Sequence, residues 1–313
     1  MHHKILVYGG LGNVGSERII PALNYLAGKF SIEYATVDLN EKGPGNYYKY
    51  GNERLQNYNA AIIATPNNTH APLAIKALNS GLNILCEKPL SNTMDSAKQI
   101  LLAAQSHPGL TAMLCDHYVY KPAIRNLLNN WQRYQEELGQ ITNIEAKVFE
   151  QGLQKVREWL FFKDISGGGI AMDTGIHIVS ILGKIFGYAN LTVRGAKMTK
   201  YPQSPGDTET YASIALSAGK IPVHIEVAKW MDNVQKQMVI KGTKSILEVD
   251  IEGGRITMDG KTKKTASKDD CYPVLIEEFL SAIEQRRLPR TTLEEGYEAL
   301  QIVVTAYQMA EWA

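Results

Sequence analysis

Apolar residues in the first third of the chain fall into short β-branched runs, separated by segments in which they recur every three or four positions. Such alternation of strand-like and helix-like segments is typical of a parallel sheet built from βαβ units. The predicted strands are residues 5–8, 32–37, 60–64, 83–86 and 110–114, and the predicted helices are residues 16–26, 71–79 and 95–106. The pattern therefore predicts an N-terminal α/β domain.

Residues 40–59 interrupt this alternation, because they are rich in Gly, Asn, Tyr and Lys and have no helical period. We expect a loop-like connection here in place of a second crossover helix and a third strand.

The pattern changes after residue 122. Residues 122–138 have helical spacing, and residues 141–149 alternate as a strand does. Further strand-like runs are residues 191–193, 211–217, 223–230, 237–241 and 245–251, and two closing helices are residues 274–286 and 293–311. Glycine turns between several of these runs predict an antiparallel sheet.

Composition excludes several classes of protein. The chain has 313 residues and a formal net charge of +1, which indicates neither a nucleic-acid nor a membrane partner. No apolar run approaches the roughly 20 residues that span a bilayer, and a strand-like run near the N-terminus leaves no room for a signal peptide. The three scattered cysteines predict reduced thiols in a cytoplasmic protein, without a metal site.

The first predicted strand ends in a glycine pattern, Gly10-Leu11-Gly12-Asn13-Val14-Gly15, and a helix-like segment follows. In this order, Gly10 permits a tight turn, Gly12 lets the backbone approach a pyrophosphate, and Gly15 lets the helix pack on the strand. A lone pattern of this kind is often only a turn, but the strand and helix around it favour a dinucleotide site that includes Asn13 and Val14.

The second predicted strand ends at Asp38, about where a dinucleotide site places an acid on the ribose hydroxyls. Its carboxylate would repel a 2′-phosphate, so NAD is favoured, with NADP possible because Lys42 lies nearby. A turn residue at a strand end is the structural alternative for Asp38.

Two further segments follow predicted parallel strands, at the sheet edge where ligands bind. Thr65, Pro66 and Asn67 are assigned to the cofactor, with His70, for which a capping or packing role is an equal alternative. Glu87 and Lys88, also assigned to the cofactor, precede Pro89 at the end of the next strand. Alone, they would be a solvated pair.

Asp173 and His177 follow three glycines and are four residues apart, so a helix would place both side chains on one face. Without the glycine pattern and Lys88, an aspartate near a helix start and a buried histidine would be the better interpretation. With them, a catalytic pair is favoured.

These motifs, in this order, resemble the glucose–fructose oxidoreductase, inositol dehydrogenase and MocA family over nearly the whole chain. The resemblance implies a Rossmann domain, residues 1–119, and a C-terminal α/β domain with an open, mainly antiparallel sheet, residues 120–313. It implies that Lys88, Asp173 and His177 are the catalytic group, that the Lys88–Pro89 peptide is cis, and that the chain forms a homodimer or homotetramer.

The chain departs from the family where an arginine usually follows the first domain. Here the run is His117-Tyr118-Val119-Tyr120-Lys121-Pro122, and His117, Tyr118 and Lys121 are similar to a short motif of glucose-6-phosphate dehydrogenases. We assign these three residues to the substrate, together with Arg157 and Trp159 in a loop before the glycines.

The sequence thus predicts an NAD-dependent oxidoreductase that moves hydride to or from a secondary alcohol carbon of a sugar or polyol. Histidine suits the proton transfer because its ordinary pKa is about 6.5. One alternative is a sugar-phosphate dehydrogenase. A non-catalytic sensor of dinucleotide or sugar is a second alternative, which the joint presence of Lys88, Asp173 and His177 disfavours.

Overall fold

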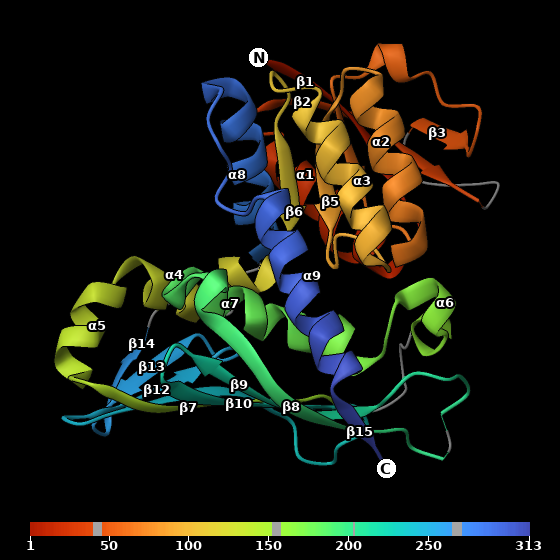
Figure 1. Ribbon diagram of the computed structural model, residues 1–313. Coiled ribbons are helices and arrows are strands. Elements are labelled where there is room, and N and C mark those ends of the chain that lie inside the picture. Colours follow the sequence, from red (N-terminus) through yellow and green to blue (C-terminus); the bar gives the residue numbers. More distant parts are fainter. Residues whose placement is uncertain (40–45, 152–157, 203, 265–270) are drawn as a thin grey trace. The chain divides into compact units, whose positions relative to one another are not determined.

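The computed structural model describes residues 1–39, 46–151, 158–202, 204–264 and 271–313 (Figure 1). The chain divides into two compact units, of which the first comprises Met1–His117 and Asp270–Tyr297 and the second Tyr118–Asp269 and Glu298–Ala313. The first break lies close to the domain boundary expected after residue 119. The predicted second domain was contiguous, whereas Asp270–Tyr297 returns to the first unit.

The first unit contains a six-stranded parallel sheet in the order β3-β2-β1-β4-β5-β6. The strands are β1 His2–Tyr8, β2 Ser31–Asp38, β3 Asn46–Lys49, β4 Ala60–Ile63, β5 Asn83–Glu87 and β6 Ala112–Cys115. Central strands are apolar on both faces: Ile5, Leu6 and Val7 in β1 are fully buried. This explains their continuous apolar runs, because helices cover both faces of a parallel sheet.

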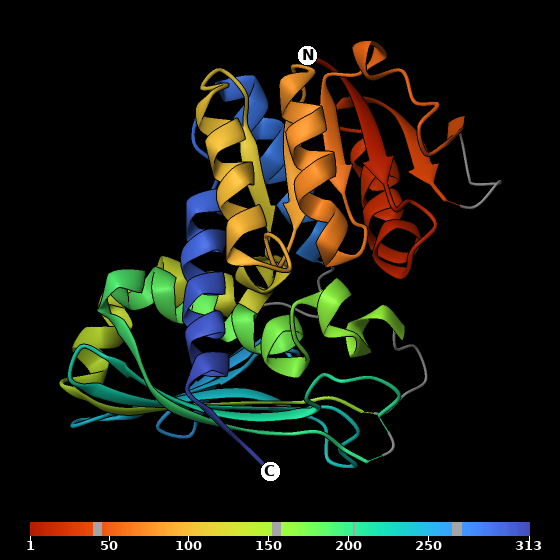
Figure 2. The same cartoon turned by 45° about the vertical axis from the view of Figure 1, so that its right-hand side comes forward.

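Four helices cover this sheet (Figures 1 and 2). Helices α2 (His70–Asn79) and α3 (Met94–Gln105) pack on each other, and α1 (Ile20–Leu26) packs on α8 (Cys271–Gln285). Helix α8 comes from the returning segment, so a part of the chain far from the N-terminus completes the first unit.

Strand β3 corrects one prediction. The segment expected to be only a loop contains Asn46–Lys49, which pairs in parallel with β2 from Ala35 to Asp38. A short strand at a sheet edge has one paired side, so it needs no alternating apolar pattern, and the Gly- and Asn-rich composition around it concealed the strand.

The second unit is built on a nine-stranded sheet in the order β14-β13-β12-β11-β7-β10-β9-β8-β15. Its strands are β7 Ile141–Phe149, β8 Leu191–Thr199, β9 Tyr211–Ala218, β10 Ile221–Ala228, β11 Gln235–Gly242, β12 Ile246–Asp250, β13 Arg255–Met258, β14 Lys261–Lys264 and β15 Ala310–Trp312. Neighbours are antiparallel except for β10 with β7 and β15 with β8, so the predicted mainly antiparallel sheet is confirmed.

One face of this sheet is apolar and carries the helices of the unit (Figures 1 and 2). In β10, Val223, Ile225 and Val227 are buried, whereas His224 and Glu226 point to the opposite face and are only partly buried. No described helix lies on that opposite face. The helices are α4 Pro122–Asn129, α5 Trp131–Leu138, α6 Lys163–Ser166, α7 Ile176–Phe186 and the second part of α9, Leu293–Gln308.

Two helix boundaries differ from the prediction. The single helix expected over residues 122–138 is interrupted at Asn130, which ends α4 and begins α5. The last helix was expected to reach residue 311 but ends at Gln308, because Ala310–Trp312 pairs with β8. The helical stretch Lys163–Phe186 is long and apolar enough to cross a membrane, but 78% of its apolar 18-residue window is buried within the protein, as in core helices.

Candidate active site

The glycine turn of the first unit lies where β1 ends and the first helix begins. The Gly9 amide donates to Val37 O at 2.9 Å, and the Gly12 amide donates to Gly9 O at 3.0 Å. The helix begins at Gly15 with a π-type turn, Gly15–Ile19, and continues as α1. The predicted order of strand, glycine turn and helix is therefore present.

The three motif glycines differ in what requires them. A Cβ at Gly10 would overlap the Thr36 side chain, and one at Gly15 would overlap the backbone of Gly9 and Gly10. A Cβ at Gly12 would meet only the Gly9 carbonyl oxygen at 3.3 Å and the Ala64 carbonyl oxygen at 4.0 Å. Gly10 and Gly15 are thus explained by packing within the chain. Gly12 is explained better by a bound ligand, because a glycine here lets the protein backbone approach a pyrophosphate. The turn therefore fits a dinucleotide.

Asp38 lies at the end of β2, beside the glycine turn. Its Oδ2 accepts from the Leu11 amide at 3.2 Å, and its Oδ1 accepts from the Leu39 amide at 2.7 Å. The carboxylate is therefore held next to the turn, at the position that suits contact with a ribose. Lys42 lies outside the described residues.

His70 joins the two predicted cofactor segments. It is fully buried at the start of α2, with Nδ1 2.9 Å from Pro89 O and Nε2 3.0 Å from Thr65 O. Burial lowers the pKa of its imidazole, which favours the neutral ring. Thr69 Oγ1, 2.6 Å from both Thr65 Oγ1 and Pro66 O, fixes the same loop. This geometry favours the packing role of His70 over direct contact with a cofactor.

Lys88 follows β5 and is partly buried, and its peptide bond to Pro89 is cis, as predicted. Glu87, directly before it, is 6% exposed and accepts at Oε1 from Cys115 Sγ at 3.0 Å and from Tyr272 Oη at 3.3 Å. Burial and this carboxylate raise the pKa of both the Cys115 thiol and the Tyr272 phenol. Glu87, the residue directly before Lys88, is thus anchored to β6 and α8. Its contact with the cofactor stays a prediction.

Asp173 and His177 lie on one continuous helix of the second unit, as expected from their spacing. The helix is not α-helical throughout, because Ala171–Gly175 forms a π-type turn that continues as α7. Such turns are rare and are frequent at functional sites. The side chain of Asp173 is 13% exposed, and His177 is 2% exposed.

Tyr118 packs against His177, the residue predicted to transfer the proton. Its ring is stacked on the His177 imidazole, with centroids 4.1 Å apart and planes 3° apart. Lys121 Nζ lies 5.0 Å from the Tyr118 ring centroid and 2.6 Å from Glu252 Oε2. Glu252 also pairs with Lys236, at 3.4 Å, so these two lysines and one glutamate keep a net positive charge, and the sugar-phosphate alternative stays open.

The structure places the other predicted substrate residues as follows. His117 belongs to the first unit and is stacked on Tyr272, with centroids 5.4 Å apart. Trp159 is partly buried in a short 3₁₀-helix, Glu158–Phe161. Arg157 lies outside the described residues. The substrate roles of these three residues stay predictions.

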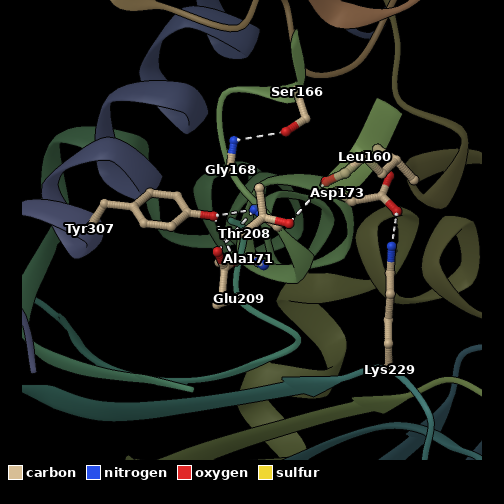
Figure 3. Close-up of polar contacts among 10 residues, drawn as sticks. Leu160, Ser166, Gly168, Ala171, Asp173, Thr208, Glu209, Lys229 and Tyr307 are labelled. Atoms are coloured by element: carbon tan, nitrogen blue, oxygen red, sulfur yellow. Dashed lines mark hydrogen bonds and ion pairs between the residues drawn. The ribbon is translucent and has the colours of Figure 1, made fainter. Parts of the chain in front are cut away.

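Glu209 and Tyr307 anchor the glycine segment, and neither was anticipated from the sequence (Figure 3). Glu209 Oε2 accepts from the Gly169 amide and Oε1 from the Ala171 amide, each at 2.9 Å, and Tyr307 Oη donates to Oε1 at 2.6 Å. Burial raises the pKa of Glu209, and burial together with this carboxylate raises that of Tyr307. The amides at the start of the helix are thereby satisfied by a buried carboxylate.

Lys229 is a third residue that the sequence interpretation missed. Its Nζ lies 3.1 Å from Asp173 Oδ2, as Figure 3 shows. The sequence placed Lys229 only within a strand-like run, residues 223–230, whereas β10 ends at Ala228. The predicted pair thus becomes a cluster in which His177 is covered by Tyr118 and Asp173 is bound by Lys229.

Two family profiles match the chain: "Oxidoreductase family, NAD-binding Rossmann fold" over residues 30–113, and "Oxidoreductase family, C-terminal alpha/beta domain" over residues 134–312. Together they cover most of the 313 residues. The chain belongs to the glucose–fructose oxidoreductase, inositol dehydrogenase and MocA family of NAD(P)-dependent oxidoreductases.

Three relatives found by sequence comparison are distant. D-glucoside 3-dehydrogenase of Escherichia coli is 23% identical over 80% of this chain and 76% of that enzyme. The NADP-dependent D-xylose 1-dehydrogenase 2 of Haloferax volcanii is 24% identical over 80% and 78%. Levoglucosan dehydrogenase of Pseudarthrobacter phenanthrenivorans is 28% identical over 46% of this chain, and that alignment spans only 36% of the enzyme.

Solved structures share the whole fold. Levoglucosan dehydrogenase in complex with NADH and levoglucosan has a TM-score of 0.86 and 17% identity, covering 99% of this chain and 97% of that one. A 3-ketoreductase of Actinomadura kijaniata in complex with NADP and TDP-benzene has a TM-score of 0.84 and 18% identity, covering 100% and 99%.

Proposed function

We propose that this protein transfers hydride between NAD and a secondary alcohol or ketone carbon of a sugar or polyol. The observation that supports it most is the cluster on the helix of the second unit, where Asp173 and His177 share one helix and both are nearly buried. A neutral imidazole and a carboxylate suit a group that must accept a hydroxyl proton and hold the hydroxyl.

In this proposal the substrate hydroxyl gives its proton to His177 while the adjacent carbon loses hydride, so that the oxygen becomes a carbonyl. The stack on Tyr118 keeps the imidazole plane from rotating. Asp173 accepts a second hydroxyl or orients the imidazole. Lys88 stabilises negative charge that develops on the reacting oxygen and helps to place the nicotinamide.

Bound nicotinamide would supply the hydride acceptor, and the protein would supply placement and electrostatics. The residues suited to hold the dinucleotide are those of the glycine turn, with Gly12 beneath the pyrophosphate and Asp38 at the ribose. Thr65, Pro66 and Asn67 complete this edge of the sheet. A carboxylate at the ribose favours NAD over NADP.

A sugar or polyol is favoured as substrate because the named relatives include dehydrogenases of glucosides, xylose and levoglucosan. The sugar-phosphate alternative is tested beside it, because Lys121 and Lys236 share Glu252 and together keep a net positive charge. A homodimer or homotetramer and a cytoplasmic location remain predictions from the sequence.

Turnover on a panel of polyols, aldoses and sugar phosphates, with NAD or NADP, tests the proposal. We expect reduction of NAD with at least one neutral sugar or polyol. For that substrate, His177→Asn should lower kcat about a hundredfold or more, and Lys88→Met should also lower it, while titration with NADH shows cofactor binding largely kept. A protein that binds NADH but oxidises or reduces no member of the panel would support the sensor alternative.

A further inference from the structure

The Lys229–Asp173 pair is shielded from solvent at both ends. The lysine side chain is 11% exposed and the aspartate side chain 13%, with Nζ and Oδ2 3.1 Å apart. Lys147 and Glu226, on neighbouring strands of the same sheet, form a pair at 2.9 Å whose side chains are 40% and 18% exposed. Water therefore screens the charges of Lys229 and Asp173 less than it screens the Lys147 pair.

The backbone around Lys229 is held on both sides. Its amide donates to Thr210 O at 2.8 Å, while Ala228 O accepts from the Glu150 amide at 2.9 Å, and the Met231 amide donates to Glu150 O at 3.1 Å. These bonds bring Lys229 to the end of β10 with little freedom to move. The side chain then extends from the sheet to the helix that carries Asp173 (Figure 3).

Trp230, the next residue, carries backbone strain. Its φ of 63° lies in the left-handed region, which a bulky side chain rarely adopts. The indole packs against the rings of Phe161 and Tyr201, with centroids 5.7 Å and 5.9 Å away. Strain of this kind persists where the surroundings over-determine a conformation, and it gathers at functional sites. The chain thus accepts strain directly beside the lysine that reaches Asp173.

Stability alone is a weak reason for such a pair. A shielded ion pair loses hydration at both charges, and apolar residues of similar size often stabilise a fold as well or better. Removal of Lys229 takes a cation away from the Asp173 carboxylate, which links the state of Asp173 to the presence of Lys229.

We propose that Lys229 is a positioning residue that acts through Asp173. Its ammonium holds one carboxylate oxygen and balances the charge, so that Asp173 meets the substrate as an oriented, ionised acceptor. The inference rests on the proposed function and extends it. It adds a second lysine, directly after β10 of the second unit, to the expected group of Lys88, Asp173 and His177.

Steady-state kinetics of Lys229→Met, Lys229→Arg and the control Lys147→Met test this inference. K229M keeps the length of the side chain and removes the charge, so kcat should fall about tenfold or more, with NADH binding unchanged. K229R keeps the charge and should recover most of the loss. K147M removes a lysine from an exposed pair of the same sheet and should stay within about twofold of the unsubstituted protein.

Two readouts separate positioning from a purely structural role. In the Asp173→Asn background, K229M should cause little further loss of kcat, because the two residues act as one unit. In K229M alone, the acid limb of the pH–rate profile, which the His177 base sets, should move to higher pH, since loss of the Lys229 cation favours the protonated imidazole. Thermal unfolding identifies any variant that fails to fold, and K229R then carries the test through its own pH profile, whose acid limb should stay in place.

The outcomes are distinct. A K229M protein with kcat within about twofold of the unsubstituted protein would overturn the role of Lys229 alone, as would an undiminished tenfold loss in the D173N background or a K229R profile displaced to higher pH. If the unsubstituted protein turns over no sugar or polyol, the proposed function fails, and this inference fails with it.

Discussion

The helix that begins at Gly15 and the helix that begins at Ala171 both follow glycine-rich segments, and both start with a π-type turn. At the first helix, a Cβ at Gly12 would make one tight contact, 3.3 Å to the Gly9 carbonyl oxygen, without overlapping any atom. At the second, the chain itself fills the space, since Tyr307 lies against Gly168 and Glu209 lies against Gly169. Similar glycine segments thus serve two needs, room for a ligand and room for an anchor.

This difference predicts that an added methyl group lowers the free energy of unfolding much more at the second helix than at the first. At Gly169 the methyl would overlap the Glu209 carbonyl oxygen and carboxylate, and a backbone atom moves only at high cost. We expect Gly169→Ala to lower the free energy of unfolding by about 3 kcal/mol, measured by denaturant titration. An unchanged midpoint of unfolding would show that the anchor tolerates the methyl group.

Gly12→Ala is the matched change at the other helix. Its methyl meets only two carbonyl oxygens, so the free energy of unfolding should change by less than about 1 kcal/mol. The affinity for NADH should nevertheless fall about tenfold or more, because the methyl takes the space assigned to the pyrophosphate. Fluorescence titration measures this loss. If G12A binds NADH as the unsubstituted protein does, the ligand does not pass over Gly12.

Asp38→Ala sharpens the assignment of the first site. Loss of one charged hydrogen-bond acceptor should weaken NADH binding about tenfold and NADPH binding less, so the ratio of the two dissociation constants should change. Paired titrations of both nucleotides measure this ratio. Equal weakening of both would remove the ribose contact and favour a structural role for Asp38 through its hydrogen bonds to the Leu11 and Leu39 amides.

His70 gives the smallest effect, which depends on pH. Since burial lowers its pKa below the ordinary 6.5, the unfolded chain takes up a proton first as the pH falls. Stability from His70 is complete above pH 6.5 and decreases below it, by at most about 1.4 kcal/mol per pH unit, until the folded-state pKa is reached. His70→Asn should have a flatter profile of unfolding free energy in this range. An identical slope would contradict the buried neutral imidazole.

Local patterns predicted the features that depend on neighbours in sequence. The strand, glycine turn and helix around Gly12, and the shared helix of Asp173 and His177, follow from spacing and from backbone geometry. The cis peptide at Lys88 came from the family resemblance, because spacing does not distinguish the two isomers.

Contacts between distant parts of the chain could not be predicted in this way. Glu209 binds an amide 38 residues away, Tyr307 one 138 residues away, and Lys229 a carboxylate 56 residues away. Each is a single polar residue without a motif: Glu209 lies just before β9, Lys229 just after β10 and Tyr307 on α9, so only the tertiary fold brings them to the helix of Asp173. The return of Asp270–Tyr297 to the first unit has the same character, since a helix pattern does not state which sheet it will cover.

The most direct test of the central claim follows an isotope. The sugar or polyol that the panel identifies is prepared with deuterium on the carbon of each secondary alcohol and is incubated with NAD and the protein. The account predicts that deuterium appears in the reduced nicotinamide and that His177→Asn slows its transfer about a hundredfold or more. Oxidation of the sugar without deuterium in the nicotinamide would contradict the proposed hydride transfer.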